Sequence, residues 1–132
     1  MQEQKVRLGA RISHILLPVS YDGMVLAESF FGDIFGWEKD SESSSRIFEE
    51  AQCFKNPADG KKVVVFPVAD KHLGRGYGFS LECESMDVLN EVLENARIWG
   101  KKKQVEVAIS TVLGEVSLSL YGNFPLDILM HT

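Results

Sequence analysis

This chain of 132 residues has little of what is typical of secreted, disulfide-bonded or membrane proteins. It has only two cysteines, Cys53 and Cys83, and no apolar run approaching the ~20 residues that a membrane span needs. Residues 1–8 are polar, so we expect no secretory signal peptide there. We therefore predict a cytoplasmic protein without membrane contact, in which both cysteines are reduced thiols.

An excess of basic residues is also missing. Lysine and arginine total 14 against 19 acidic residues, which gives a net charge of -5. A protein that binds a phosphate backbone carries a basic face. The two basic clusters, Lys61-Lys62 and residues 101–103, both lie beside a glycine and are interpreted as solvated turns. Nucleic acid is therefore not an expected partner.

What is present is an ordinary globular composition, with 45% hydrophobic and 25% charged residues, arranged as an internal repeat. Hydrophobic periodicity predicts a strand, a helix and three strands, twice over, with a period of about 64 residues. The fold class is α+β, in a single domain 1–132 with one half at about 10–72 and the other at about 76–132. The predicted elements are strands 12–19, 46–54 and 62–68 with helix 24–35, then strands 78–84, 104–110, 115–121 and 126–130 with helix 86–99. Gly36 and Gly100 are expected to end the two helices.

Alternation along the strands separates two faces, because neighbouring side chains of a strand point in opposite directions. The apolar set of each strand is assigned to the face that packs on a helix: Ile15, Leu17 and Val19 in the first strand, Phe79, Leu81 and Cys83 in the fifth, and Leu126, Ile128 and Met130 in the last. The opposite face then carries His14, Leu16, Ser80, Glu82, Asp127 and Leu129.

Two stretches resemble the first module of the vicinal oxygen chelate superfamily, which includes glyoxalase I, bleomycin resistance proteins and extradiol dioxygenases. They are ISHILLPV at 12–19, with its histidine, and FFGDIFGWE at 30–38. The resemblance implies two tandem βαβββ modules whose curved sheets form an open cup. It further implies helices on the convex side, a ligand on the concave side and a homodimer. The strand 62–68, taken as an edge strand, is a second reason to expect a partner copy.

The resemblance also implies four positions for the ligands of a divalent metal ion, two in each module. His14 and Asp127 match two of these positions. Gly78 stands where the second histidine is expected, and strand 62–69 contains no acidic residue. Two ligands hold a metal ion only weakly. We therefore expect no metal or other cofactor, with His14 and Asp127 as the weak candidates for a metal site.

The predicted ligand-binding residues are the members of the face opposite the helices: His14, Leu16, Ser80, Glu82, Asp127 and Leu129. His14 is either a base near neutral pH or a locally hydrogen-bonded side chain. Glu82 is either an acid or base with a raised pKa or a partner of a lysine or arginine. Two carboxylates favour an uncharged or cationic ligand over an anion. No catalytic residue is assigned.

The predicted function is metal-independent binding of a small organic molecule, as in glyoxalase- and bleomycin-resistance-type proteins. One alternative is a metal-dependent lyase, isomerase or dioxygenase with an atypical metal site. The other is a non-catalytic dimeric interaction module. An open, partly apolar cleft would favour ligand binding, and a filled one would favour the interaction module.

Overall fold

Two sets of elements with the same order, strand–helix–three strands, make up the described chain. The computed structural model describes residues 14–40, 50–69, 77–112, 114–122 and 124–132. The first set is β1 (His14–Ser20), α1 (Met24–Ser29), η1 (Phe30–Phe35), β2 (Glu38–Lys39), β3 (Gln52–Lys55) and β4 (Lys62–Val68). The second set is β5 (Gly78–Glu82), α3 (Met86–Lys103), β6 (Val107–Val112), β7 (Glu115–Leu120) and β8 (Leu126–His131). The predicted boundary between the halves, at 72–76, lies outside the described residues.

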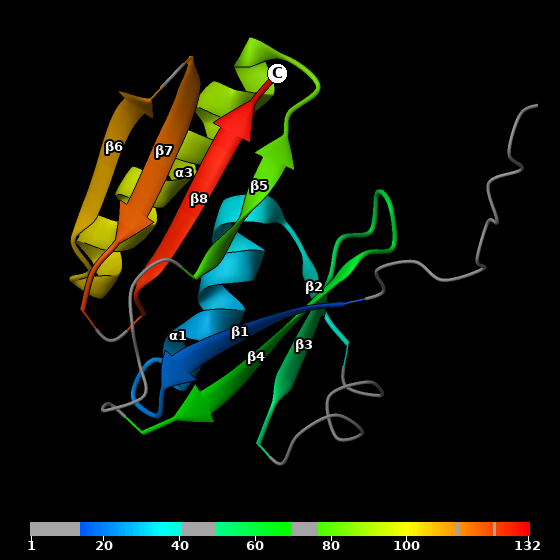
Figure 1. Cartoon of the computed structure of the whole chain (residues 1–132), viewed down its shortest axis with the longest axis vertical. Helices are drawn as coiled ribbons and strands as arrows, with labels where there is room; N and C mark the ends of the chain where they lie inside the picture. The colour runs from blue at the N-terminus through cyan, green and yellow to red at the C-terminus, as the bar shows by residue number, and fades with distance from the viewer. Residues whose placement is uncertain (1–13, 41–49, 70–76, 113, 123) are drawn as a thin grey trace, which may run out of the picture.

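Each set forms its own four-stranded mixed sheet (Figure 1). The strand orders are β1-β4-β3-β2 and β5-β8-β7-β6, so the two halves share one topology. Both sheets begin with a parallel pair, β1 with β4 and β5 with β8, and continue with antiparallel pairs. Since both sheets keep their edge strands in the described part of the chain, they do not close into a barrel. The predicted α+β fold of two open βαβββ units is confirmed.

One detail of that prediction was wrong. Strand 62–68 was taken as an edge strand, but it is β4, which pairs with β1 on one side and with β3 on the other. Its run of valines is buried because it lies inside the sheet. The edges are β1 and β2 in the first sheet and β5 and β6 in the second.

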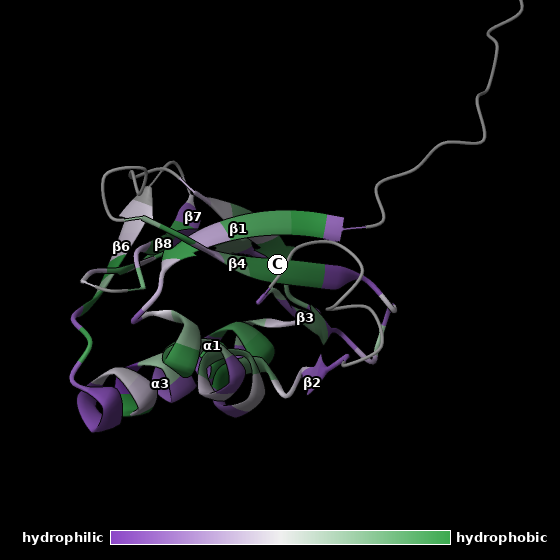
Figure 2. Cartoon of the chain, turned by 90° about the horizontal axis from the view of Figure 1, so that it is seen from below, coloured by the Kyte–Doolittle hydropathy of each residue, from purple (hydrophilic) through white to green (hydrophobic). Residues whose placement is uncertain are grey.

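The helices lie side by side on one side of the two sheets (Figure 2). The main hydrophobic core fills the space between these layers. It contains most of the side chains that alternation assigned to the helix-facing side: Leu17, Val19, Cys83, Leu126, Ile128 and Met130; Phe79 and Leu81 are half-buried and pack against it. The exception is Ile15, which remains 38% exposed. The assignment of faces from the sequence is therefore confirmed for most positions, and Ile15 marks a place where the core is open.

Aromatic rings join the two halves across this core. Phe30 lies 5.3 Å from Trp99 and 4.9 Å from Phe124, measured between ring centroids. The indole N–H of Trp99 donates a hydrogen bond to the Ser29 hydroxyl at 3.0 Å. Burying one such ring contributes about 1.5–3 kcal/mol, so these contacts hold α1, η1 and α3 in one layer.

The first helix differs from the continuous one predicted over 24–35. Residues 24–29 are α-helical, and residues 30–35 form the wider turn of a π-helix. Gly36 ends it in the left-handed conformation, with φ of 73°, as predicted. Beyond Gly36 the chain turns back, and the ring of Trp37 stacks on Phe31 at 5.6 Å between centroids.

The second helix begins as predicted and ends later. The Ser85 hydroxyl accepts a hydrogen bond from the Val88 backbone N–H, which confirms the N-cap. The helix does not end at Gly100 but continues to Lys103, and Gln104 takes the left-handed position. Gly100 is instead a point of close packing, because a Cβ there would lie 2.5 Å from a methyl group of Val107. Among the described residues, no helix combines the length and apolar character that crossing a membrane requires.

The other strands differ from the prediction mainly at their ends. In the predicted strand 46–54 only residues 50–54 fall within the described ranges, and the strand there is Gln52–Lys55. The short strand β2 at 38–39 has no counterpart in the prediction. β5 ends at Glu82, two residues early, and β6 begins at Val107, three residues late.

Candidate functional site: a cleft between the two sheets

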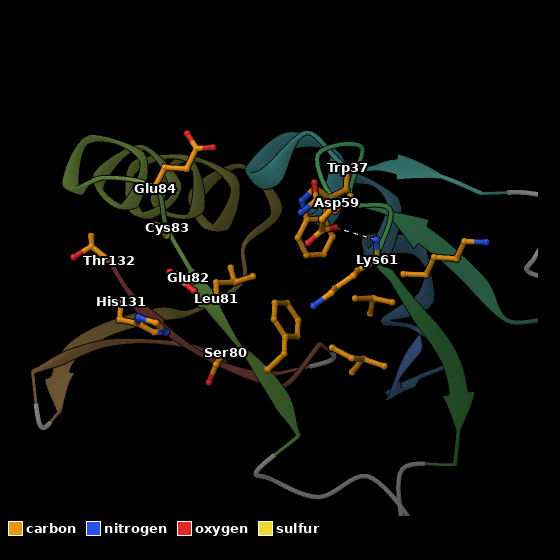
Figure 3. A pocket seen from close by; sticks show the side chains of 15 residues that line it. Trp37, Asp59, Lys61, Ser80, Leu81, Glu82, Cys83, Glu84, His131 and Thr132 are labelled. Carbon is orange, nitrogen blue, oxygen red and sulfur yellow. Dashed lines mark hydrogen bonds between the residues drawn. The ribbon is translucent and has the colours of Figure 1, made fainter. Parts of the chain in front are cut away.

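A cleft of about 680 Å³ opens where the edge strand β5 of the second sheet faces β1 and β4 of the first (Figure 3). Apolar and polar side chains both line it, which is the usual character of a small-molecule site. The lining residues are Ile15, Trp37, Asn56, Asp59, Lys61, Lys62, Val63, Phe79, Ser80, Leu81, Glu82, Cys83, Glu84, His131 and Thr132.

β5 forms one whole wall of this cleft. Because β5 is an edge strand, side chains from both of its faces reach the opening: Phe79 and Leu81 from the helix-facing side, Ser80 and Glu82 from the other. Glu82 lies beside His131 in the parallel register of β5 and β8. Glu82 and His131 are therefore neighbours at one rim of the cleft.

The turn between β3 and β4 forms the facing wall. Its shape is fixed by short-range hydrogen bonds: the Gly60 N–H donates to the Asn56 carbonyl at 2.8 Å, and the Lys61 N–H donates to the Asp59 carboxylate at 2.9 Å. Gly60 has φ of 75°, which favours glycine at that position. The side chain of Lys61 points from this turn toward Leu81 (Figure 3). Lys61 is exposed, as expected for a solvated turn, and it also brings a positive charge to the wall of the cleft.

A second lysine at the cleft is held by an ion pair. The Lys62 ammonium lies 2.9 Å from the Asp40 carboxylate, and both side chains are largely buried. The thiol of Cys53 lies close to this pair. Burial raises the pKa of Cys53, Asp40 raises it further, and Lys62 opposes them. Cys53 is therefore a protonated, fully buried thiol at neutral pH.

Cys83 is the thiol that reaches the cleft. It is 7% exposed and lies just beyond the end of β5. Its backbone N–H donates to the His131 carbonyl at 2.7 Å, which extends the pairing of β5 with β8 by one residue. Burial raises the pKa of this thiol too, so it is a weak nucleophile near neutral pH.

Trp37 forms the aromatic surface of the cleft. Its ring stacks on Phe35 at 5.0 Å and lies 6.1 Å from Phe79, between centroids. The sequence analysis gave no site role to Trp37, Lys61, Phe79, Leu81 or His131. For Phe79 and Leu81, the signal that could have identified them is their place on β5, the edge strand that borders the cleft.

The structure brings together only part of the predicted ligand-binding set. Ser80 and Glu82 line the cleft, whereas His14, Leu16, Asp127 and Leu129 are absent from its lining. These four lie on the sheet faces turned away from the main core. Leu129 is next to Ser80 and Asp127 is next to Gly78 in the β5–β8 register, and His14 is next to Lys62 in the β1–β4 register. Asp127 and Leu129 lie on the sheet face that alternation predicts. The cleft, however, lies at the junction of the two sheets, so neither residue lines it.

The positions that the resemblance implies for a metal ion do not fit one. A Cβ at Gly78 would overlap the backbone carbonyl oxygen of Asp127, so this position has no room for any side chain, histidine included. β4 offers no carboxylate opposite His14. Within the described ranges, no group of three or more histidine, cysteine, aspartate or glutamate side chains is arranged to hold a metal ion.

Comparison with solved structures identifies this architecture. A glyoxalase/bleomycin resistance protein/dioxygenase family enzyme from Burkholderia phytofirmans superposes with a TM-score of 0.63 at 10% identity, covering 92% of this chain and 97% of that one. The fold is therefore the one seen in structures of glyoxalase/bleomycin resistance protein/dioxygenase proteins. The fosfomycin resistance protein FosX from Listeria monocytogenes gives a TM-score of 0.59 at 21% identity, with coverage of 95% and 94%.

A member of the glyoxalase/bleomycin resistance protein/dioxygenase superfamily from Sphaerobacter thermophilus gives a TM-score of 0.59 at 15% identity, with coverage of 92% and 98%. No model of a protein family matches this sequence, and no curated protein matches it either. At these identities the vicinal oxygen chelate likeness establishes the fold, and function has to be argued from the site.

Proposed function

We propose that this protein binds a small organic molecule in the cleft between its two sheets and needs no metal ion to do so. The observation that carries the proposal is the open cleft of about 680 Å³, which has an aromatic and aliphatic surface and a few converging polar groups. Such a hollow is large enough for a drug-sized molecule. A purely structural interaction module would have no reason to keep it open.

The polar groups define how a ligand would be oriented. Trp37, Phe79 and Leu81 offer apolar contact, while Glu82 and Lys61 offer charges of opposite sign on facing walls. We include Ser80 and Glu82 in the binding site. His14, Leu16, Asp127 and Leu129 remain proposed contacts on the adjoining sheet faces, which a larger ligand would reach.

Metal independence is supported by the close approach of β8 to Gly78, which disfavours the alternative of a metal-dependent lyase, isomerase or dioxygenase. The test is elemental analysis of purified protein. We expect no stoichiometric divalent metal. About one metal ion per chain, lost on His14→Ala, would overturn this part of the proposal.

We further propose a cytoplasmic homodimer. The four strands at the sheet edges, β1, β2, β5 and β6, each have one side unpaired within the described chain. Leu16 and Leu129 are exposed on the sheet faces. Light scattering is expected to give about twice the chain mass of 14.8 kDa, and the mass of one chain at all concentrations would contradict the dimer.

The binding proposal is tested by blocking the cleft. Compounds that stabilise the metal-free protein in a thermal-shift screen are titrated against Ser80→Tyr, which places a large ring in the cleft mouth without touching the core. The matched control is Ser110→Tyr. Ser110 lies in the same row of the second sheet on the opposite edge strand, and it is also exposed. We expect affinity to fall at least tenfold in Ser80→Tyr only; equal affinities in the two variants, or no stabilising compound at all, would overturn the proposal.

A further inference from the structure

A second hollow, of about 480 Å³, adjoins the cleft. We call it the rear compartment. It shares Trp37, Asn56 and residues 81–84 with the cleft and extends between η1 and the first half of α3. The residues that line it alone are Gly32, Asp33, Ile34, Phe35, Gly36, Ala58, Val88, Glu91, Val92 and Asn95. The two hollows are therefore adjacent, and Trp37 borders both of them.

The inner surface of the rear compartment is apolar and closely packed. Ile34 and Val92 are buried in the main core, and Val88 packs against it. Phe35 and Trp37 are stacked with 30° between their ring planes. The Asn95 amide is tied to the Ile34 carbonyl by a hydrogen bond of 3.2 Å, which joins α3 to η1. The hollow is thus built by packed elements from both halves of the chain.

The charged side chains that line the rear compartment are all acidic. Four carboxylates line it from three different elements: Asp33 of η1, Glu82 and Glu84 at the end of β5, and Glu91 of α3. No lysine, arginine or histidine is among its lining residues. Within the described chain, none of these four carboxylates forms an ion pair; the pairs present there are Lys39 with Glu28, Lys62 with Asp40 and Arg97 with Glu94.

The neighbouring cleft shares Glu82 and Glu84 but is also lined by Lys61, Lys62 and His131, whereas Asp33 and Glu91 border only the rear compartment. All four residues are exposed, and a cation bound in the hollow that they line would be attracted to each carboxylate. The face of an aromatic ring such as Trp37 also attracts an ammonium or guanidinium group. An anion, by contrast, would meet four like charges.

We propose that the rear compartment receives the cationic end of an organic ligand, an amine or a guanidine, whose apolar body lies against Trp37. The inference rests on the proposed binding function and specifies its ligand class. The positive charge of the amine is attracted to the carboxylates of Asp33 and Glu91. The aryl or alkyl part displaces water from the apolar surfaces of Trp37, Leu81 and Val88.

The test uses three small probes that share one aromatic ring: phenethylamine, phenethyl alcohol and phenylpropionate. Binding is followed by tryptophan fluorescence of the metal-free protein. Trp37 borders both hollows, whereas Trp99 is 2% exposed, so quenching reports Trp37; Trp37→Phe verifies the source of the signal. We expect the ammonium probe to bind most tightly and the carboxylate probe least.

Two charge-removing variants locate the cation. Asp33→Asn and Glu91→Gln are each expected to weaken binding of phenethylamine about two- to fivefold, the range of partly exposed charge pairs, and to leave phenethyl alcohol unchanged. The matched control is Glu94→Gln, which removes the same charge three residues further along α3 from a residue that does not line the hollow. That variant should bind all three probes as the parent does.

The outcomes separate the two proposals. If phenethyl alcohol binds as tightly as phenethylamine, or if Glu94→Gln weakens the amine as much as Glu91→Gln does, the cationic site is wrong and the binding cleft stands. If no probe quenches Trp37, the binding function itself is contradicted, and the inference is overturned with it.

Discussion

Gly78 lies where two neighbouring strands, β5 and β8, come very close together. The resemblance identifies this position as one where a metal-binding histidine is expected, but alignment of motifs offers no reason for a glycine there. The structure supplies the reason, since β8 approaches so closely that a Cβ would overlap the carbonyl oxygen of Asp127. The tight pairing of β5 with β8 therefore leaves no room for a histidine side chain at this position.

Gly78→Ala is expected to lower the free energy of unfolding by about 3 kcal/mol, at the upper end of the cost of overpacking. The reason is that β5 has to move away from Asp127 to admit a methyl group. Urea denaturation followed by circular dichroism measures the change. The control is Ser80→Ala, two residues along the same strand, which should stay within about 0.5 kcal/mol of the parent. A Gly78→Ala protein as stable as the parent would show that the two strands are further apart.

The two thiols should react very differently with a thiol reagent. Burial raises the pKa of Cys83, so its thiolate fraction is small at neutral pH and keeps increasing with pH beyond the ~8.5 of an ordinary thiol. The labelling rate of native protein should therefore still climb above that pH. Cys53 is 0% exposed and should label only on unfolding. Mass spectrometry of labelled peptides checks both, and fast labelling of Cys83 at neutral pH would contradict its buried environment.

At the scale of elements, α3 shows where sequence patterns mislead. A glycine after a run of helical residues predicts a C-terminal cap, and Gly100 was interpreted in that way. The helix instead continues through Gly100, where the missing side chain leaves room for β6. The backbone turns only at Gln104. Hydrophobic periodicity describes one element at a time, so it cannot distinguish a glycine that ends a helix from one that admits a neighbouring strand.

Gly100→Ala sets two effects of opposite sign against each other. Helix propensity alone would stabilise the protein by about 1 kcal/mol. The added Cβ, however, would lie 2.5 Å from a Val107 methyl group and 2.9 Å from the Val105 carbonyl oxygen. We expect the steric cost to prevail, with a net loss of about 1–2 kcal/mol, measured by thermal or urea unfolding. Combining it with Val107→Ala should recover part of the loss; a Gly100→Ala protein more stable than the parent would contradict this packing.

At the scale of the whole molecule, the sequence predicted the architecture better than the site. The repeat of strand, helix and three strands, together with alternation in each strand, leads to two βαβββ sheets with helices on one side. The site depends on where the edges of two sheets meet, and no local pattern encodes that distance. Lys61 illustrates the difference: its sequence neighbours correctly predict an exposed turn, but they do not predict that the β3–β4 turn lies at the wall of the cleft.

The most direct test of the binding account is a chemical-shift map of metal-free, isotope-labelled protein titrated with a compound from the screen. We predict that the largest shifts lie at the Trp37 indole N–H and at the backbone of Leu81 and Cys83, because these groups border the cleft. Shifts confined to Leu16, Asp127 and Leu129 would place the ligand on the open sheet faces and contradict the cleft as the site.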